Sequence, residues 1–282
     1  MSALKFKLEP DGLGRPLDQP SEIKEPSLAQ TYDAFQIFNE YLQPDTKTSH
    51  DSAVESLLAL VPKADNDQEV MTIINVVLEL AEQIPYYHPS HIKLARIMEE
   101  FSCHSRFTWK LLDDEFAFVE YYLLEVMHQR VGPSEEDPQA WPNFNAFLAH
   151  AQSRGVGPKE PEWALETLRD TFERGIDPSN FRDFSNFEGE RDQEIIAAAQ
   201  YILWDGQSMF KRCLCPVPGD MGHDSYNRLR DGYYMFSLGR WRRWKNGFKK
   251  NAEEENGVGE ECRKVCAKTA ALMETMEASM RF

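Results

Sequence analysis

The sequence lacks the motifs that would assign it a reaction. It contains no HExxH zinc signature, no P-loop, no GxGxxG fingerprint and no Ser–His–Asp order that would indicate a hydrolase. No run approaches the roughly 18 apolar residues that a membrane span needs. The first residues, MSALKFKLEPDGLG, lack the apolar core of a signal peptide. We therefore expect a cytoplasmic protein with no membrane partner and no cofactor.

Cysteine and histidine are sparse and poorly spaced for metal binding. Five cysteines, an odd number in 282 residues, do not suggest a disulfide framework, so we expect reduced thiols. Cys213 and Cys215 precede a proline rather than forming a CxxC knuckle, and Cys262 and Cys266 lie four apart. We interpret them as buried free thiols and predict no metal site. In the HPSH stretch, 88–91, we expect surface or capping histidines.

Basic residues are outnumbered, yet they gather in one place. The chain has 47 acids against 31 bases and a net charge of −16, which argues against nucleic-acid binding because phosphates would be repelled. The segment 226–250 nevertheless holds eight bases and one acid, interleaved with aromatic residues. The rest of the chain then carries −23, so we expect this basic-aromatic segment to find its opposite charges within the protein.

Helical periodicity dominates the chain after a proline-rich start. We expect an extended arm over 1–26, then a single all-helical domain over 27–282. The predicted class is all-α, an irregular, HEAT-like bundle of about ten antiparallel helices with no strand. The loop 132–139 is the one candidate boundary, and we expect it not to separate two cores. The expected helices cover about 27–43, 49–61, 67–84, 90–101, 107–131 (a central helix), 141–154, 161–174, 188–213, 234–248 and 259–280.

The basic-aromatic segment forms one helix face in which apolar residues recur three or four apart. Those residues are Tyr234, Leu238, Trp241, Trp244 and Phe248. The favoured interpretation is an aromatic core face with a rim of arginines. The alternative is the wall of a cationic pocket, in which Arg240 and Arg243 bind an anionic ligand and tryptophan stacks on it. Gly239 and Gly247 would allow the backbone to approach a neighbour closely.

Asp205 is the strongest single candidate for chemistry. It follows Trp204 in the stretch YILWDGQSMF, where the helix is otherwise apolar for ten residues, and a buried carboxylate must be paired or protonated. We favour a salt bridge to Arg243 or Arg240. The alternative is a general base with a raised pKa, with Gln207 orienting a ligand. Such a pocket would be lined by tryptophans, namely Trp109, Trp204, Trp241 and Trp244.

Three stretches, in order, carry a resemblance to a known family. WPNFNAFLAHAQSRG, AAAQYILWDGQSMF and RWRRWKNGFKK resemble an all-α family of filamentous ascomycete fungi, the domain of unknown function 3632. The resemblance covers about 130–250 and implies a fungal, intracellular, all-helical protein. It supplies neither an activity nor catalytic residues. The matching residues are Trp141, Asn143, Asn145, Phe147, Ala198, Ala199, Gln200, Trp204, Gly206, Gln207, Arg240, Trp241, Trp244 and Phe248.

Two functions of different classes follow from these observations. The favoured one is a helical interaction or scaffold protein, which predicts that Arg240, Arg242 and Arg243 face solvent or acidic neighbours. The alternative is a small-molecule-binding protein or cofactor-independent enzyme of fungal secondary metabolism, which needs Asp205 and Arg243 to converge on an aromatic pocket. The partner is then a protein or a small molecule, in the second case an anionic one.

Overall fold

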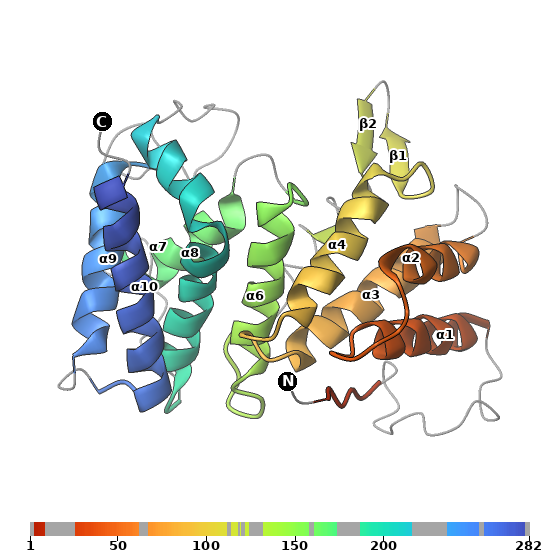
Figure 1. Cartoon of the computed structure of the whole chain (residues 1–282), viewed down its shortest axis with the longest axis horizontal. Helices are drawn as coiled ribbons and strands as arrows, with labels where there is room; N and C mark the ends of the chain where they lie inside the picture. Colours follow the sequence, from red (N-terminus) through yellow and green to blue (C-terminus); the bar gives the residue numbers. More distant parts are fainter. Residues whose placement is uncertain are drawn as a thin grey trace. The chain divides into compact units, whose positions relative to one another are not determined.

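A computed structural model describes most of the chain (Figure 1). The described residues are 3–8, 26–61, 67–111, 114–117, 119, 122–123, 132–157, 161–173, 187–215, 236–253 and 257–279. The side chains of 26–28, 67 and 108–117 lie outside this description. The chain divides into two compact units, one of 1–131 with 150–159 and one of 132–149 with 160–282. The loop 132–139 therefore begins the second unit, and the single-domain expectation stays a prediction.

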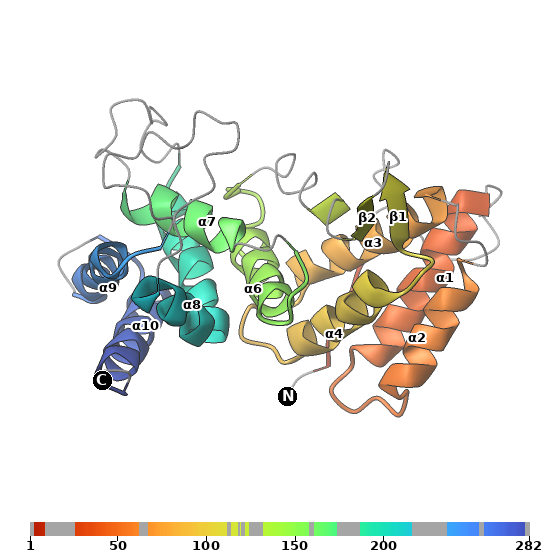
Figure 2. The same cartoon turned by 90° about the horizontal axis from the view of Figure 1, so that it is seen from above.

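Four helices whose bounds are described pack around one core in the first unit. They are α1 (Pro26–Tyr41), α2 (His50–Ala59), α3 (Asp67–Gln83) and α4 (Ser90–Cys103). α1 packs on α2 and α3, and α4 contacts both of the latter (Figure 2). α3 has apolar residues on two sides, and both Val76 and Leu80, which lie off its main stripe, are buried. A helix that is apolar on two sides has to be covered on both, and α3 is.

The expected central helix over 107–131 is wrong over its first part. β1 (Thr108–Leu111) and β2 (Asp114–Ala117) form an antiparallel hairpin instead. TWKL alternates polar and apolar residues with a period of two, the pattern of a strand rather than of a helix. The backbone register sets Trp109 opposite Phe116 and Lys110 opposite Glu115. These features favour a hairpin over the helical spacing of the same residues.

The second unit contains α6 up to Ala149 and four further helices. α6 spans Ala140–Ser153, and the others are α7 (Glu162–Phe172), α8 (Glu190–Leu214), α9 (Leu238–Ala252) and α10 (Glu260–Ser279). α10 packs along both α8 and α9, and α7 contacts both α8 and α9. Gly155 follows α6 with φ 77°, as expected for a residue that ends a helix in the left-handed region. The largest fully buried side chains of this unit are Trp163, Tyr201, Trp241, Trp244, Phe144, Phe147 and Phe248.

The all-α class is confirmed. Nine helices, together with the helical residues 119, 122 and 123, account for the regular structure of the described residues, apart from the short hairpin. Among those helices, none combines the length and the apolar composition that a membrane span requires. Of the expected arm over 1–26, residues 3–8 are described and the remainder lies outside the described residues.

A buried glutamate shared by two arginines

α9 positions the predicted basic-aromatic residues, and its two sides differ sharply. Ser237 begins the helix, since its side-chain oxygen accepts a hydrogen bond from the backbone N–H of Arg240 at 3.2 Å. Trp241, Trp244 and Phe248 are fully buried, as the core-face interpretation predicts. On the opposite side of α9 the exposed residues include Arg242, Lys249 and Lys250. Tyr234, the first residue of the predicted stripe, lies outside the described residues.

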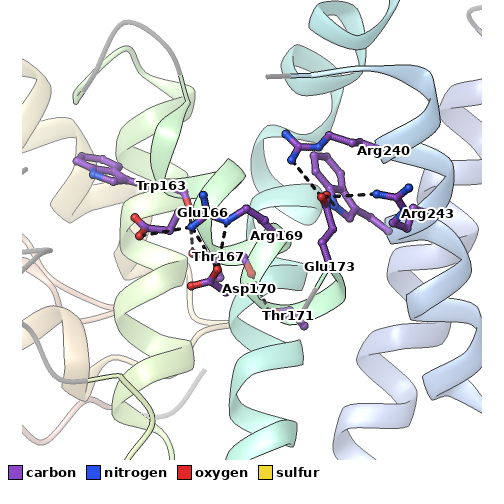
Figure 3. Close-up of polar contacts among 10 residues, drawn as sticks. Trp163, Glu166, Thr167, Arg169, Asp170, Thr171, Glu173, Arg240 and Arg243 are labelled. Atoms are coloured by element: carbon purple, nitrogen blue, oxygen red, sulfur yellow. Dashed lines mark hydrogen bonds and ion pairs between the residues drawn. The ribbon is translucent and has the colours of Figure 1, made fainter. Parts of the chain in front are cut away.

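The side chain of Arg240 in α9 contacts a carboxylate at the end of α7 (Figure 3). Its Nη2 donates to Oε2 of Glu173 at 3.0 Å, and Arg243 Nη1 lies 3.6 Å from the same oxygen. The other oxygen, Oε1, accepts the indole N–H of Trp244 at 2.8 Å. Both oxygens of Glu173 are therefore engaged, two of these contacts being charge-assisted hydrogen bonds.

The surroundings of Glu173 explain why it needs these partners. Its side chain is only 4% exposed, and that of Arg240 is 6% exposed. Glu173 also ends α7, where the backbone carbonyls disfavour a negative charge. Removing two charges from water is costly unless they meet each other with good geometry. The cluster of Glu173, Arg240, Arg243 and Trp244, called here the Glu173 cluster, meets this requirement and joins α7 to α9.

Sequence reasoning did not single out Glu173. It named Asp205 as the counter-charge of these arginines, and the structure places Asp205 in α8 as a buried residue. Its pairing with Arg240 or Arg243 stays a prediction. Glu173 gave no signal, because a glutamate near the end of an amphipathic helix is ordinarily solvated.

The other predicted site residues lie in different surroundings. Trp204 is 37% exposed, and its indole N–H donates to Oε1 of Gln200 at 3.1 Å, while Gln207 is exposed. Trp241 and Trp244 are fully buried, so neither ring is accessible from solvent. Trp109 belongs to β1 in the first unit, and its side chain lies outside the described residues. A pocket formed by these tryptophans stays a prediction.

Three of the four predicted buried thiols of the second unit, Cys213, Cys262 and Cys266, are buried, whereas the prediction is wrong for Cys215, which is exposed. Burial raises the pKa of Cys213 to about 12, although the nearby Arg240 acts to lower it. A hydrogen bond with Cys266, together with burial, raises the pKa of Cys262. Both groups are therefore neutral thiols and poor nucleophiles at neutral pH. In the part of the chain that the structure describes, no three metal-binding side chains gather at one place.

The prediction that the histidines of the HPSH stretch lie on the surface is wrong. His88 and His91 are both buried, although Nδ1 of His88 does serve the start of α4 by accepting the backbone N–H of Ser90 at 3.2 Å. Nε2 of His91 donates to the Ile84 carbonyl at 2.9 Å, and its ring stacks on His150 at 6.2 Å between centroids. Burial lowers the pKa of His91 to about 3 and that of His150 to about 4, so both rings are neutral.

These features define an all-helical protein with a buried carboxylate–arginine cluster in one unit. The family model described as "Protein of unknown function (DUF3632)" matches residues 75–248, which is more than half of the chain. The chain belongs to this family. The matched range runs from within α3 to Phe248 in α9 and includes the whole Glu173 cluster. No curated protein and no solved structure matches the chain.

Proposed function

We propose that this chain is a helical interaction protein that binds an acidic segment of a protein partner along the exposed side of α9. One observation carries the proposal. α9 buries its aromatic residues and Arg240, and it leaves Arg242, Lys249 and Lys250 exposed in a chain of net charge −16. These three bases follow one another at helical spacing, so an extended or helical acidic segment could lie along them.

The neighbouring helix α10 neutralises part of this charge. Lys249 forms an ion pair with Glu274 of α10, and both side chains are 48% exposed. Lys245 is more enclosed and pairs with Glu277 at 2.7 Å. An exposed ion pair contributes little to stability and exchanges readily with other partners. Lys249 therefore remains available to an acidic ligand that competes with Glu274.

The burial of the tryptophans supports an interaction protein over the small-molecule alternative. A ligand pocket needs aromatic surface that a ligand can touch, and Trp241 and Trp244 offer none. The polar atoms beside them serve the fold, because both oxygens of Glu173 already accept hydrogen bonds from α9. Arg240 and Arg243 face an acidic neighbour, as this function requires.

Binding of a fluorescein-labelled oligoglutamate peptide, followed by fluorescence anisotropy in low-salt buffer, tests the proposal. We expect saturable binding that Arg242→Glu weakens several-fold. It should disappear at about 0.5 M salt, where charges are screened within a few ångströms. Lys264→Glu is the matched control, because Lys264 is an exposed base on α10 with the same change of charge. An equal loss from Lys264→Glu would show a general charge effect and would refute a site on α9.

A thermal-shift screen against acidic and aromatic metabolites tests the alternative function. A compound that stabilises the chain, but no longer does so after Asp205→Asn, would favour the small-molecule function and count against our proposal. If no compound shifts the midpoint, or if Asp205→Asn leaves every shift unchanged, the predicted Asp205 site is wrong.

A further inference from the structure

The N-terminal segment, residues 3–8 with the sequence ALKFKL, lies on the first unit as an extended chain. Burial alternates along it, since Leu4 and Phe6 are half-buried and Leu8 is buried, while the residues between them are exposed. A period of two is typical of an extended backbone with one side turned toward a surface. The apolar residues therefore face the protein and the two lysines face solvent.

Two glutamine side chains hold the backbone of this segment. Oε1 of Gln43 accepts the N–H of Leu4 at 3.0 Å, and Nε2 of Gln43 donates to the carbonyl of the same residue at 3.2 Å. Gln83, the last residue of α3, does the same with Lys7, both distances being 2.8 Å. We call Gln43 and Gln83 the amide clamps.

The paired bonds determine how the segment lies. One residue can present its N–H and its carbonyl to a single amide only when its backbone is extended, as in a hydrogen-bonded pair of an antiparallel sheet. Leu4 and Lys7 are three residues apart, and residues at an odd spacing direct these groups to opposite edges of an extended chain. The amide clamps therefore grip the segment from its two edges, one from just beyond α1 and one from the end of α3.

Both amide clamps are oriented by their own helices. Nε2 of Gln43 also donates to the carbonyl of Asn39 at 2.9 Å, and Nε2 of Gln83 donates to that of Glu79 at 3.3 Å. In each glutamine, the side-chain NH₂ group is held by the backbone carbonyl four residues earlier. The side-chain oxygen is thereby oriented to accept a hydrogen bond from the segment. A site that is oriented before its ligand arrives loses less entropy on binding.

α4 fixes the end of α1 that carries the first clamp. Nζ of Lys93 donates to the carbonyls of Tyr41 and Gln43 at 3.1 and 2.7 Å, and its ammonium lies 5.4 Å from the centre of the Tyr41 ring. The hydroxyl of Ser90 donates to the carbonyl of Leu42 at 2.5 Å. These bonds satisfy carbonyls that the helix itself leaves unpaired. The clamp therefore stands on a rigid support.

We propose that the amide clamps form a binding site for an extended peptide with apolar side chains at three alternating positions, and that the N-terminal segment is its displaceable internal occupant. The clamps contact main-chain atoms only, so the site does not require the sequence ALKFKL. Specificity comes from the apolar positions that Leu4, Phe6 and Leu8 fill, as in other sites that recognise extended peptides.

The N-terminal segment determines how tightly a separate peptide must bind the amide clamps in order to displace it. A segment on the same chain has an effective concentration of about millimolar, so a separate peptide binds with an apparent affinity lowered by that competition. The bonds at Gln83 are solvent-exposed and each contributes modestly to binding, which lets the segment leave without unfolding the unit. This site belongs to the first unit and is independent of the proposed function of α9.

The test uses the full-length chain opened by Leu4→Pro with Lys7→Pro, since proline has no N–H to donate to either clamp. The probe is an acetylated, amidated, fluorescein-labelled peptide of residues 2–10, SALKFKLEP. We expect saturable binding to the opened chain, at least about ten-fold tighter than to the unmodified chain, where the internal segment competes. Equal binding to both chains, or none to the opened one, would overturn the proposal.

Two matched pairs separate main-chain recognition from adhesion of an apolar peptide. A peptide N-methylated at the position of Lys7 keeps every side chain but lacks one N–H, and it should bind about ten-fold less tightly. In the opened chain, Gln83→Leu removes two hydrogen bonds and should weaken binding at least about ten-fold, whereas Gln68→Leu, at an exposed glutamine on the same helix, should not. If N-methylation or Gln83→Leu has no effect, the clamps are not the site.

Amide hydrogen exchange of the unmodified chain gives a second readout that does not depend on the opened variant. Excess unlabelled peptide should accelerate exchange at Leu4 and Lys7 as it displaces them, and unchanged rates would count against displacement. Analytical sedimentation tests whether the segment instead occupies the amide clamps of a second copy of the chain. If the unmodified chain is a dimer that Lys7→Pro converts to a monomer, the segment occupies a second copy, and an internal occupant is refuted.

Discussion

Trp244 and Arg240 donate to the two different oxygens of one buried carboxylate, Glu173. The two donors lie four apart on α9, so one face of that helix supplies both. Arg240 and Glu173 are 67 residues apart in the sequence, and their contact joins the end of α7 to the start of α9. The stability of the second unit should therefore depend strongly on this group of residues.

Glu173→Gln should destabilise the chain by about 3 kcal/mol, because it removes the negative charge from a buried position and leaves Arg240 without that partner. Urea unfolding followed by circular dichroism measures the loss. The double variant Glu173→Gln with Arg240→Met should lose clearly less than the two single variants combined, since the only charge left in the cluster is then Arg243, which is about a third exposed. Additive losses would contradict a coupled pair.

Trp244→Phe and Trp241→Phe form a matched pair on one helix. Both indoles are fully buried, but the N–H of Trp244 is bonded to Glu173, whereas that of Trp241 has no hydrogen-bond partner among the described residues. Trp244→Phe should cost about 1.5–3 kcal/mol more in unfolding free energy, the contribution of a hydrogen bond to a charged group. Equal losses would mean that packing alone accounts for both residues.

Gly247→Ala should destabilise the chain, while Gly239→Ala should stabilise it. A Cβ at Gly247 would lie 2.4 Å from the ring of Phe172, whereas at Gly239 the nearest atom is 3.7 Å away. Overpacking costs about 1–3 kcal/mol, and alanine in an open helical position gains up to about 1 kcal/mol over glycine. Thermal unfolding midpoints should move in opposite directions, and a stabilising Gly247→Ala would show that Phe172 moves aside freely.

Acid should weaken the first unit through its buried histidines. Burial lowers the pKa of His91 to about 3 and of His150 to about 4, both below the ordinary value of 6.5. The unfolded chain therefore binds more protons below pH 6.5, so stability is complete above that pH and is lost as the pH falls. The loss should approach about 1.4 kcal/mol per pH unit for each histidine.

Urea midpoints between pH 7.5 and pH 4.5 measure this slope. His91→Gln cannot be protonated and retains an amide donor for the Ile84 carbonyl, so it should reduce the slope by up to half. An unchanged slope in His91→Gln would show that other groups cause the acid sensitivity.

Much of the helical framework was predictable because it depends on neighbours in the sequence. The spacing of Trp241, Trp244 and Phe248 predicts one buried face of α9, and they are buried. Gly155 marks the end of α6 by the same local logic. The hairpin at 108–117 was missed because its residues satisfy helical spacing as well as strand alternation, and cross-strand pairing decides between the two.

Sequence by itself determined the all-α class and the amphipathic character of α9, because local periodicity decides which residues can share a buried face. Only the tertiary structure decided which carboxylate meets Arg240, because Glu173 is one of many acids and its burial depends on how α7 packs against α9. It likewise decided that the segment ALKFKL is held by Gln43 and Gln83, 39 and 76 residues away. The partner of a polar group depends on which residues the tertiary packing brings near it, and sequence periodicity does not contain that information.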